Sequence, residues 1–230
     1  MMGTIVLAGG AEFGGAMEEL DRRSLEKAGG SDASVRIIPA AAAPDNNHAR
    51  AGKNGIDWFR SLGVADVRAL PLIDRASADE PDVVSSLRHA DLIYLLGGFP
   101  GYLAQSLADS RSWDAILAAL EDGAVISGSS AGAMVLCMYF YDPHHERLCQ
   151  GLHLVAGGCV VPHHRSFGQT WVPRLKSLIP DVTLIGLDEQ TGLLNISPGW
   201  EWQVYGAGSV VIYRAGQIET YESGDTVVLT

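Results

Sequence analysis

Short apolar, β-branched runs alternate along this chain with longer amphipathic stretches, and this alternation restricts the folds open to it. Runs that are apolar throughout are typical of strands buried on both faces, and the stretches between them are long enough for helices. The pattern therefore predicts an α/β fold in which a mostly parallel sheet is flanked by helices. The strands expected in the first part of the chain are Thr4–Ala8, Val35–Pro39, Val67–Leu72, Leu92–Leu96 and Ala124–Ser127.

Amphipathic stretches predict the helices, and turn residues mark several of their ends. Asp79 is expected to cap one helix, because Pro81 falls in its first turn. From Gly192 onward, alternating segments predict antiparallel hairpins at one edge of the sheet. The expected helices are Phe13–Ala28, His48–Leu62, Asp79–His89, Gly101–Ala108, Ser112–Glu121, Ala131–Tyr139 and Thr170–Leu178, and two later strands are Val155–Val161 and Val182–Leu187.

Length and charge narrow the class of protein further. No internal repeat, low-complexity tract or linker interrupts the pattern, so we expect residues 1–230 to form a single domain. The formal net charge of −11 argues against a nucleic-acid partner, which would require clustered Lys and Arg. No apolar stretch approaches the length of a membrane span, so no membrane partner is expected. The three cysteines form no paired framework, which favours a reducing cytoplasm, and no pattern implies a cofactor.

One strand runs directly into Gly128-Ser129-Ser130-Ala131-Gly132, which matches the G-x-S-x-G pattern of a nucleophile elbow. In such an elbow a sharp strand-to-helix turn projects the serine hydroxyl from the sheet, and a Cβ at either glycine would collide with the turn. The N–H of Ala131 would then face a developing oxyanion. The alternative is a packing turn, in which small residues merely fit a tight space. The buried strand before the motif and the helix after it favour Ser130 as a nucleophile.

A serine hydroxyl needs a base to take its proton, so a histidine should lie within reach of Ser130. His163 and His164 follow a predicted buried strand, at the edge where a parallel sheet collects functional loops. An acid to orient the imidazole could come from Asp188 or Glu189, which follow the next predicted strand. The residues alone leave open that these four side chains are simply exposed in loops.

The remaining histidines give weaker indications of a catalytic or metal-binding role. Two lie in predicted helices, and three lie in an irregular stretch together with two acidic residues. Neighbouring histidines usually diverge, and no second pair of ligands has helical spacing, so we expect no metal site. These histidines are His48, His89, His144, His145 and His153.

Five segments, taken in order, resemble peptidase family S51, the serine peptidases that include dipeptidase E and cyanophycinase. The resemblance extends from residue 4 to about residue 213, and the order of the segments makes it specific. The segments are Leu7–Glu12, Leu95–Gly98, Gly128–Ala133, Pro162–His164 and Leu187–Leu193.

The resemblance implies a flavodoxin-like fold, similar to that of class I glutamine amidotransferases. The backbone N–H groups of Gly98 and Ala131 would form the oxyanion hole, and Asp188 is the lesser choice for the acid. The order serine, histidine, acid along the chain differs from the order in α/β-hydrolases. The three catalytic residues that the resemblance implies, as nucleophile, base and acid, are Ser130, His163 and Glu189.

Two segments depart from the family. Members commonly follow the Gly-Gly of the oxyanion loop with a polar residue that helps to bind substrate, whereas here Phe99 and Pro100 follow. We therefore expect a more apolar pocket beside the nucleophile. Cyanophycinases carry several arginines soon after the catalytic histidine, whereas here Arg165 alone is close and is the local candidate to bind a substrate carboxylate. Gln190 is also expected to face the pocket.

These features favour a serine peptidase or amidohydrolase that acts on a small peptide or related amide. The departures at Phe99 and Pro100 motivate an alternative, a non-catalytic protein that binds a small metabolite on the same fold. An ammonia-producing amidotransferase is a weaker alternative, because the elbow carries serine rather than cysteine. The C-terminal hairpins offer an edge at which a second copy could pair to form a homo-oligomer.

Overall fold

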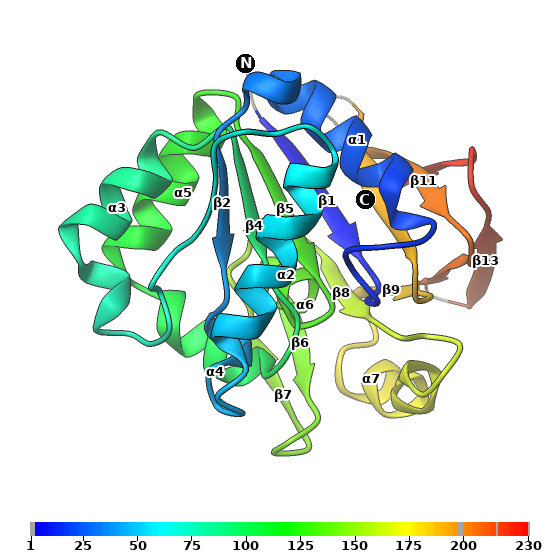
Figure 1. The fold of residues 1–230 in the computed structure, drawn as a ribbon. Helices are drawn as coiled ribbons and strands as arrows, with labels where there is room; N and C mark the ends of the chain where they lie inside the picture. Colours follow the sequence, from blue (N-terminus) through cyan, green and yellow to red (C-terminus); the bar gives the residue numbers. More distant parts are fainter. Residues whose placement is uncertain (1–2, 197–199, 215, 230) are drawn as a thin grey trace.

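The computed structural model describes residues 3–196, 200–214 and 216–229. Among these residues, eight strands form the main sheet, in the order β14-β11-β10-β1-β5-β4-β2-β3 (Figure 1). Five neighbouring strands lie parallel, as the alternating pattern predicts, so their carboxyl ends meet at one edge. The parallel strands are β1 (Thr4–Ala8), β2 (Val35–Ile38), β3 (Val67–Ala69), β4 (Leu92–Leu95) and β5 (Val125–Ser129).

Helices cover both faces of this sheet, because successive residues of each buried strand point to opposite sides. On β4, Leu92 and Tyr94 pack into one core while Ile93 and Leu95 pack into the other. The core that holds Leu92 and Tyr94 lies against α1 (Met17–Ala28) and α2 (His48–Ser61). The core that holds Ile93 and Leu95 lies against α3 (Pro81–Arg88), α4 (Pro100–Leu107), α5 (Arg111–Glu121) and α6 (Ala131–Leu136) (Figure 1).

No helix among the described residues is both long and apolar enough to cross a membrane.

The C-terminal strands are divided between two sheets, which corrects the expectation of hairpins at one edge. Three of them extend the main sheet beyond β1 with antiparallel pairing: β10 (Thr191–Asn195), β11 (Glu201–Gly206) and β14 (Thr226–Val228). The β12–β13 hairpin instead pairs with β9 in a second, four-stranded sheet. This sheet contains β8 (Gly158–Val161), β9 (Thr183–Leu187), β12 (Val210–Arg214) and β13 (Gln217–Tyr221), and α7 (Val172–Leu178) connects β8 to β9.

The helix expected over Ala131–Tyr139 is shorter than predicted, because α6 ends at Leu136. The aromatic residues that follow form β6 (Tyr139–Asp142), which pairs with β7 (Arg147–Gln150) in a hairpin that the sequence pattern did not predict. Aromatic residues are common in strands, and here the pairing with β7 makes this run a strand rather than the end of a helix.

The predicted cap of α3 is also wrong. Glu80 occupies the N-cap position before Pro81, and its side chain makes no capping hydrogen bond. Asp79 instead accepts a hydrogen bond from the backbone N–H of Arg111 at 2.8 Å, so it connects this region to the start of α5. The proline had correctly indicated the first turn of the helix.

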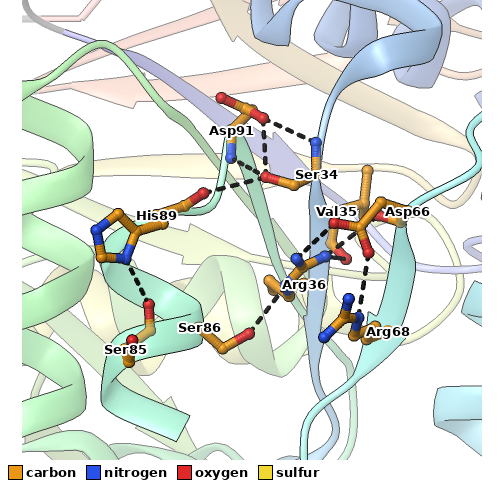
Figure 2. A network of polar contacts seen from close by, with 9 residues as sticks. All are labelled: Ser34, Val35, Arg36, Asp66, Arg68, Ser85, Ser86, His89 and Asp91. Atoms are coloured by element: carbon orange, nitrogen blue, oxygen red, sulfur yellow. Dashed lines mark hydrogen bonds and ion pairs between the residues drawn. The ribbon is translucent and has the colours of Figure 1, made fainter. Parts of the chain in front are cut away.

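A polar network at the amino end of β2 lies opposite the edge where the parallel strands end (Figure 2). Arg36 is 7% exposed, and its guanidinium group donates to Asp66 Oδ2 at 2.7 Å and to Ser86 Oγ at 2.9 Å. Next to it, Asp91 Oδ2 accepts hydrogen bonds from the backbone N–H and the hydroxyl of Ser34, each at 2.8 Å. The hydrogen bond from Arg36 lowers the pKa of Asp66. A buried cation on a core strand is thereby neutralised and hydrogen-bonded.

We expect Asp66→Asn to lower the free energy of unfolding by about 1–3 kcal/mol, because Arg36 loses its carboxylate partner. Since the folded-state pKa of Asp66 is lowered, this stabilisation should be present at neutral pH and lost as the pH falls through that pKa. Urea denaturation at neutral and acidic pH measures both effects. Glu18→Gln, which breaks the exposed pair with Arg22, is the control and should cost less than about 0.5 kcal/mol. Equal losses in the two variants would contradict this prediction.

Candidate active site

Ser130 occupies the corner between β5 and α6, where the sequence predicts a nucleophile elbow. Its backbone has φ 48° and ψ −111°, a sparsely populated conformation that costs energy for a residue with a Cβ. Its N–H donates to the carbonyl of Ala8 at 2.9 Å, which fixes the corner to β1. A Cβ at Gly132 would lie 2.2 Å from the carbonyl oxygen of Leu95, so no larger residue fits there. The glycines of the motif therefore serve close packing, and the serine between them is half-buried at the carboxyl edge of the sheet.

His163 lies beside this serine, and Glu189 lies beside His163. The distance from Ser130 Oγ to His163 Nε2 is 3.0 Å, and the distance from His163 Nδ1 to Glu189 Oε1 is 2.8 Å. A carboxylate can only accept, so Nδ1 carries the proton and donates to Glu189. Nε2 of the neutral imidazole is then free to accept the proton of the serine hydroxyl. The three side chains thus form one continuous chain of hydrogen bonds.

The turn after β1 holds both the histidine and the acid in place. The N–H of His163 donates to the carbonyl of Gly9 at 2.9 Å, and the N–H of Gln190 donates to the carbonyl of Gly10 at 3.0 Å. A Cβ at Gly10 would lie 2.3 Å from Cε1 of His163, so the imidazole rests directly on the bare Cα of this glycine. No role for these glycines was predicted, although they fall within the family-like segment Leu7–Glu12.

Asp188, the lesser candidate for the acid, does not contact His163. It is 4% exposed, and its carboxylate accepts hydrogen bonds from the backbone N–H groups of Arg165 at 3.0 Å and Ser209 at 2.9 Å. Its nearest imidazole is that of His164, with Nδ1 at 3.6 Å from Oδ1. Burial lowers the pKa of His164, an effect that Asp188 opposes. The structure therefore contains a second, buried histidine–aspartate pair whose hydrogen bonds connect the loops to Tyr213 and Ser209.

Residues 96–99, the loop expected to serve as the oxyanion loop, connect β4 to α4 and lie against Ser130. Gly98 has φ 137°, and a Cβ there would lie 2.2 Å from the carbonyl oxygen of Ala41. A Cβ at the preceding Gly97 would lie 3.3 Å from Cβ of Ser130, which places the loop beside the serine. Within the described residues, the N–H groups of Gly98 and Ala131 donate to no other group. Both are therefore available to a ligand at this edge of the sheet.

Two aromatic side chains flank the site. Phe99 stacks on His144 with ring centroids 4.0 Å apart, and the hairpin β6–β7 supplies that histidine. Phe167 is exposed and stacks on His163 with ring centroids 5.0 Å apart. Phe99 was expected near Ser130 from the sequence, whereas Phe167 was not recognised, although it lies in the loop directly after His163, the expected base. Phe167 therefore adds apolar surface beside His163, whereas the Phe99 ring lies against His144.

Arg165 and Gln190 lie on the other side of the acid. The guanidinium group of Arg165 is 3.3 Å from Asp188 Oδ2, and its side chain is 75% exposed. The side-chain amide of Gln190 lies against Gly15. Both residues line a cavity of about 290 Å³ that also includes Glu189 but neither Ser130 nor the oxyanion loop. The structure thus does not place them beside the serine, where substrate contacts were expected.

A larger groove of about 680 Å³ begins at the oxyanion loop and follows α2. Glu12 lies at the end next to the nucleophile, and Ser129 Oγ donates to its Oε2 at 2.8 Å. No role for Glu12 was predicted, although it ends one of the family-like segments. The groove is lined by Glu12, Phe13, Ala42, Asp45, Asn47, Arg50, Ala51, Asn54, Asp57, Trp58, Ser61, Gly97 and Gly98.

The histidines considered as metal ligands are arranged differently. His145 Nδ1 lies 2.8 Å from Asp142 Oδ2, whereas His144 stacks on Phe99. Across residues 3–196, 200–214 and 216–229, no group of three or more His, Cys, Asp or Glu side chains is placed to hold a metal ion.

Comparison with known proteins agrees with this architecture. A cyanophycinase of Synechococcus elongatus is 30% identical over 224 residues, covering 91% of this chain and 67% of the cyanophycinase. The crystal structure of a peptidase from an acI-B1 actinobacterium superposes with a TM-score of 0.88 at 29% identity, covering 100% of this chain and 98% of that one. A candidate peptidase E from Listeria monocytogenes EGD-e shares the fold, with a TM-score of 0.63 at 18% identity over 96% of this chain and 99% of that one.

The family model extends across the elements that carry the site. The model of peptidase family S51 matches residues 5–197, which include the elbow, the oxyanion loop and the loops after β8 and β9. The expectation drawn from the five sequence segments is confirmed, as is the mostly parallel α/β fold with antiparallel C-terminal strands. This chain is a peptide hydrolase that belongs to peptidase family S51.

Proposed function

We propose that the protein is a serine peptidase or amidohydrolase that cleaves a small peptide or related amide with Ser130, His163 and Glu189. The observation that carries the proposal is the continuous contact from Ser130 Oγ to His163 Nε2 at 3.0 Å and from His163 Nδ1 to Glu189 Oε1 at 2.8 Å. A nucleophile, a base and a carboxylate that orients the base are the parts that acyl transfer requires.

The first half of the reaction forms an acyl-enzyme. Ser130 Oγ attacks the carbonyl carbon while its proton passes to Nε2 of His163, and the carbonyl electrons move to the oxygen. The N–H groups of Gly98 and Ala131 stabilise this oxyanion. When the carbonyl re-forms, the C–N bond breaks and His163 gives the proton to the departing amine nitrogen.

The second half repeats these steps with water. His163 takes a proton from a water molecule as the water oxygen attacks the acyl carbon. When the carbonyl re-forms, the ester bond to Ser130 Oγ breaks and His163 gives this proton to Oγ. The products are the free acid and the regenerated serine. Glu189 accepts the hydrogen bond from Nδ1 throughout, so it holds the reactive tautomer and stabilises the imidazolium.

Two observations weigh against an acidic residue beside the scissile bond. The exposed Phe167 ring stacks on His163, and the Arg165 guanidinium is already paired with Asp188. The relatives named cyanophycinase therefore do not by themselves supply the substrate of this chain. No observation favours a non-catalytic metabolite-binding role, because the three side chains of the proposed triad are in contact.

We also propose the domain organisation, partners, compartment and assembly of the enzyme. Residues 1–230 would act as a single hydrolytic domain, without a cofactor and without a nucleic-acid or membrane partner. The unpaired cysteines Cys137, Cys149 and Cys159 support a reducing compartment such as the cytoplasm. A homo-oligomer would use the exposed strands of the C-terminal hairpin, where Ile218 is exposed.

We expect Ser130→Ala to lower kcat by a factor of about 10⁴ or more, because the variant has no nucleophile. The measurement is amine release from a panel of dipeptides that includes α- and β-aspartyl peptides and peptides with apolar first residues. Thermal unfolding of both proteins shows whether the fold is retained. Unchanged turnover in the variant would overturn the assignment of Ser130. Ligands that stabilise both proteins without being cleaved by either would favour the binding protein instead.

Adjacent substitutions should separate the catalytic carboxylate from the structural one. We expect Glu189→Gln to lower kcat by about 10²–10⁴-fold with little change in the melting temperature, because the amide no longer fixes the imidazole tautomer. Asp188→Asn should instead lower the melting temperature and leave kcat within about 10-fold, since Asp188 supports the loops through Arg165 and Ser209. The reverse pattern would make Asp188 the triad acid.

A further inference from the structure

We propose that Glu12 binds the free α-amino group of the substrate, so that the enzyme releases the first residue of a short peptide. This inference rests on the proposed function, because it concerns the residue whose carbonyl Ser130 attacks. It goes beyond that function by naming the charge that the site selects and the end of the peptide that it recognises.

The Glu12 carboxylate is fixed by the residue that precedes the nucleophile. Ser129 is fully buried, and its Oγ donates to Glu12 Oε2 at 2.8 Å. Ser129 and Ser130 are consecutive, so the position of the carboxylate is tied to the same corner that positions the nucleophile. A group held in this way can recognise a substrate without first being ordered.

The carboxylate lies within reach of an amino group beside the scissile bond. A Cβ at Gly97 would lie 3.4 Å from Glu12 Oε1 and 3.3 Å from Cβ of Ser130. The carboxylate and the nucleophile are thus separated by no more than these two contact distances together. In a peptide with a free N-terminus, one carbon atom separates the amino nitrogen from the first carbonyl carbon. An amino group so placed can approach Glu12 while Ser130 attacks that carbonyl.

No cation within the protein neutralises this carboxylate. Among the described residues, no Lys, Arg or His side chain forms an ion pair with Glu12, and Oε1 accepts no hydrogen bond. Burial raises the pKa of the nearby Asp21 to about 7, and the charge of Glu12 adds to this effect. Ser129 supplies a neutral hydrogen bond to this half-buried carboxylate but no positive charge, and a substrate ammonium group would supply that charge.

The groove provides space for the residue that carries this amino group. Its volume is about 680 Å³, and Phe13 and Trp58 contribute apolar surface. The groove residues of α2 recur at intervals of three and four, so they lie on one face of the helix. Asp57 is already paired with Lys53. Among the described residues that line the groove, the carboxylates without an ion pair are those of Glu12 and Asp45, and Glu12 is the one held beside Ser130 through Ser129.

The test uses three peptides that differ in charge: norleucyl-leucine, its N-acetyl derivative and N-acetyl-lysyl-leucine. The first carries an α-ammonium group, the second carries no cation at its first residue, and the third carries a cation only on the side chain. Leucine release gives kcat/KM for wild type, Glu12→Gln and Glu19→Gln. Glu12→Gln keeps an acceptor for Ser129, and Glu19→Gln removes the same charge from an exposed position of α1 outside the groove.

We expect Glu12→Gln to lower kcat/KM for norleucyl-leucine by about 10–100-fold, the range for a hydrogen bond between charged groups. The acetylated peptides should change less than about 3-fold, because they lack the amino group that Glu12 binds. Glu19→Gln should change none of them. Equal losses for all three peptides would overturn the proposal and give Glu12 a structural role through Ser129. A loss confined to N-acetyl-lysyl-leucine would overturn the α-amino assignment in favour of a basic side chain.

Calorimetric binding to Ser130→Ala makes this test independent of turnover. We expect this variant to bind norleucyl-leucine about 10-fold or more tightly than the acetylated peptide, and Glu12→Gln in the same background to abolish the difference. If wild type cleaves none of the peptides but this binding pattern appears, the proposed function fails and the role of Glu12 stands. Cleavage without any Glu12-dependent preference would refute the role of Glu12 and leave the proposed function intact. Absence of binding to every peptide at millimolar concentration would also refute the role of Glu12.

Discussion

Three consecutive carbonyl groups at the end of β1 hold the whole site together. The carbonyl oxygens of Ala8, Gly9 and Gly10 accept hydrogen bonds from the backbone N–H groups of Ser130, His163 and Gln190, respectively. These donors come from three loops, two of which leave the second sheet. One strand end therefore sets the relative positions of Ser130, His163 and the turn that carries Glu189, and it does so through backbone atoms whose spacing is fixed by peptide geometry.

Much of this arrangement could be predicted from the sequence, because buried parallel strands and the G-x-S-x-G turn are local patterns. The strands β1, β2, β4, β5 and β9 appear within one or two residues of their predicted bounds. The hairpin β6–β7 could not be read in this way, because its aromatic run resembles the continuation of a helix until the pairing partner is known. The division of the C-terminal strands between two sheets likewise depends on contacts between distant segments.

Adjacent residues were the hardest to separate. Asp188 and Glu189 look equivalent in the sequence, as do His163 and His164, yet one residue of each pair reaches the site and the other is buried. Successive side chains at the end of a strand point in different directions, and register alone decides which one meets Ser130. The position of the Arg165 side chain was hard to predict for a related reason, because its partner Asp188 follows another strand. The resemblance to the family, rather than the residue types, favoured Glu189.

Ser130, His163 and Gln190 all have positive φ, of 48°, 47° and 53°. Glycine would adopt each of these backbone conformations at lower cost. Under the proposed mechanism, selection for catalysis and selection for stability therefore act in opposite directions at Ser130 and His163. A lineage freed from the need to hydrolyse peptides would gain robustness by replacing them, so an inactive descendant on this fold could be more stable than its ancestor.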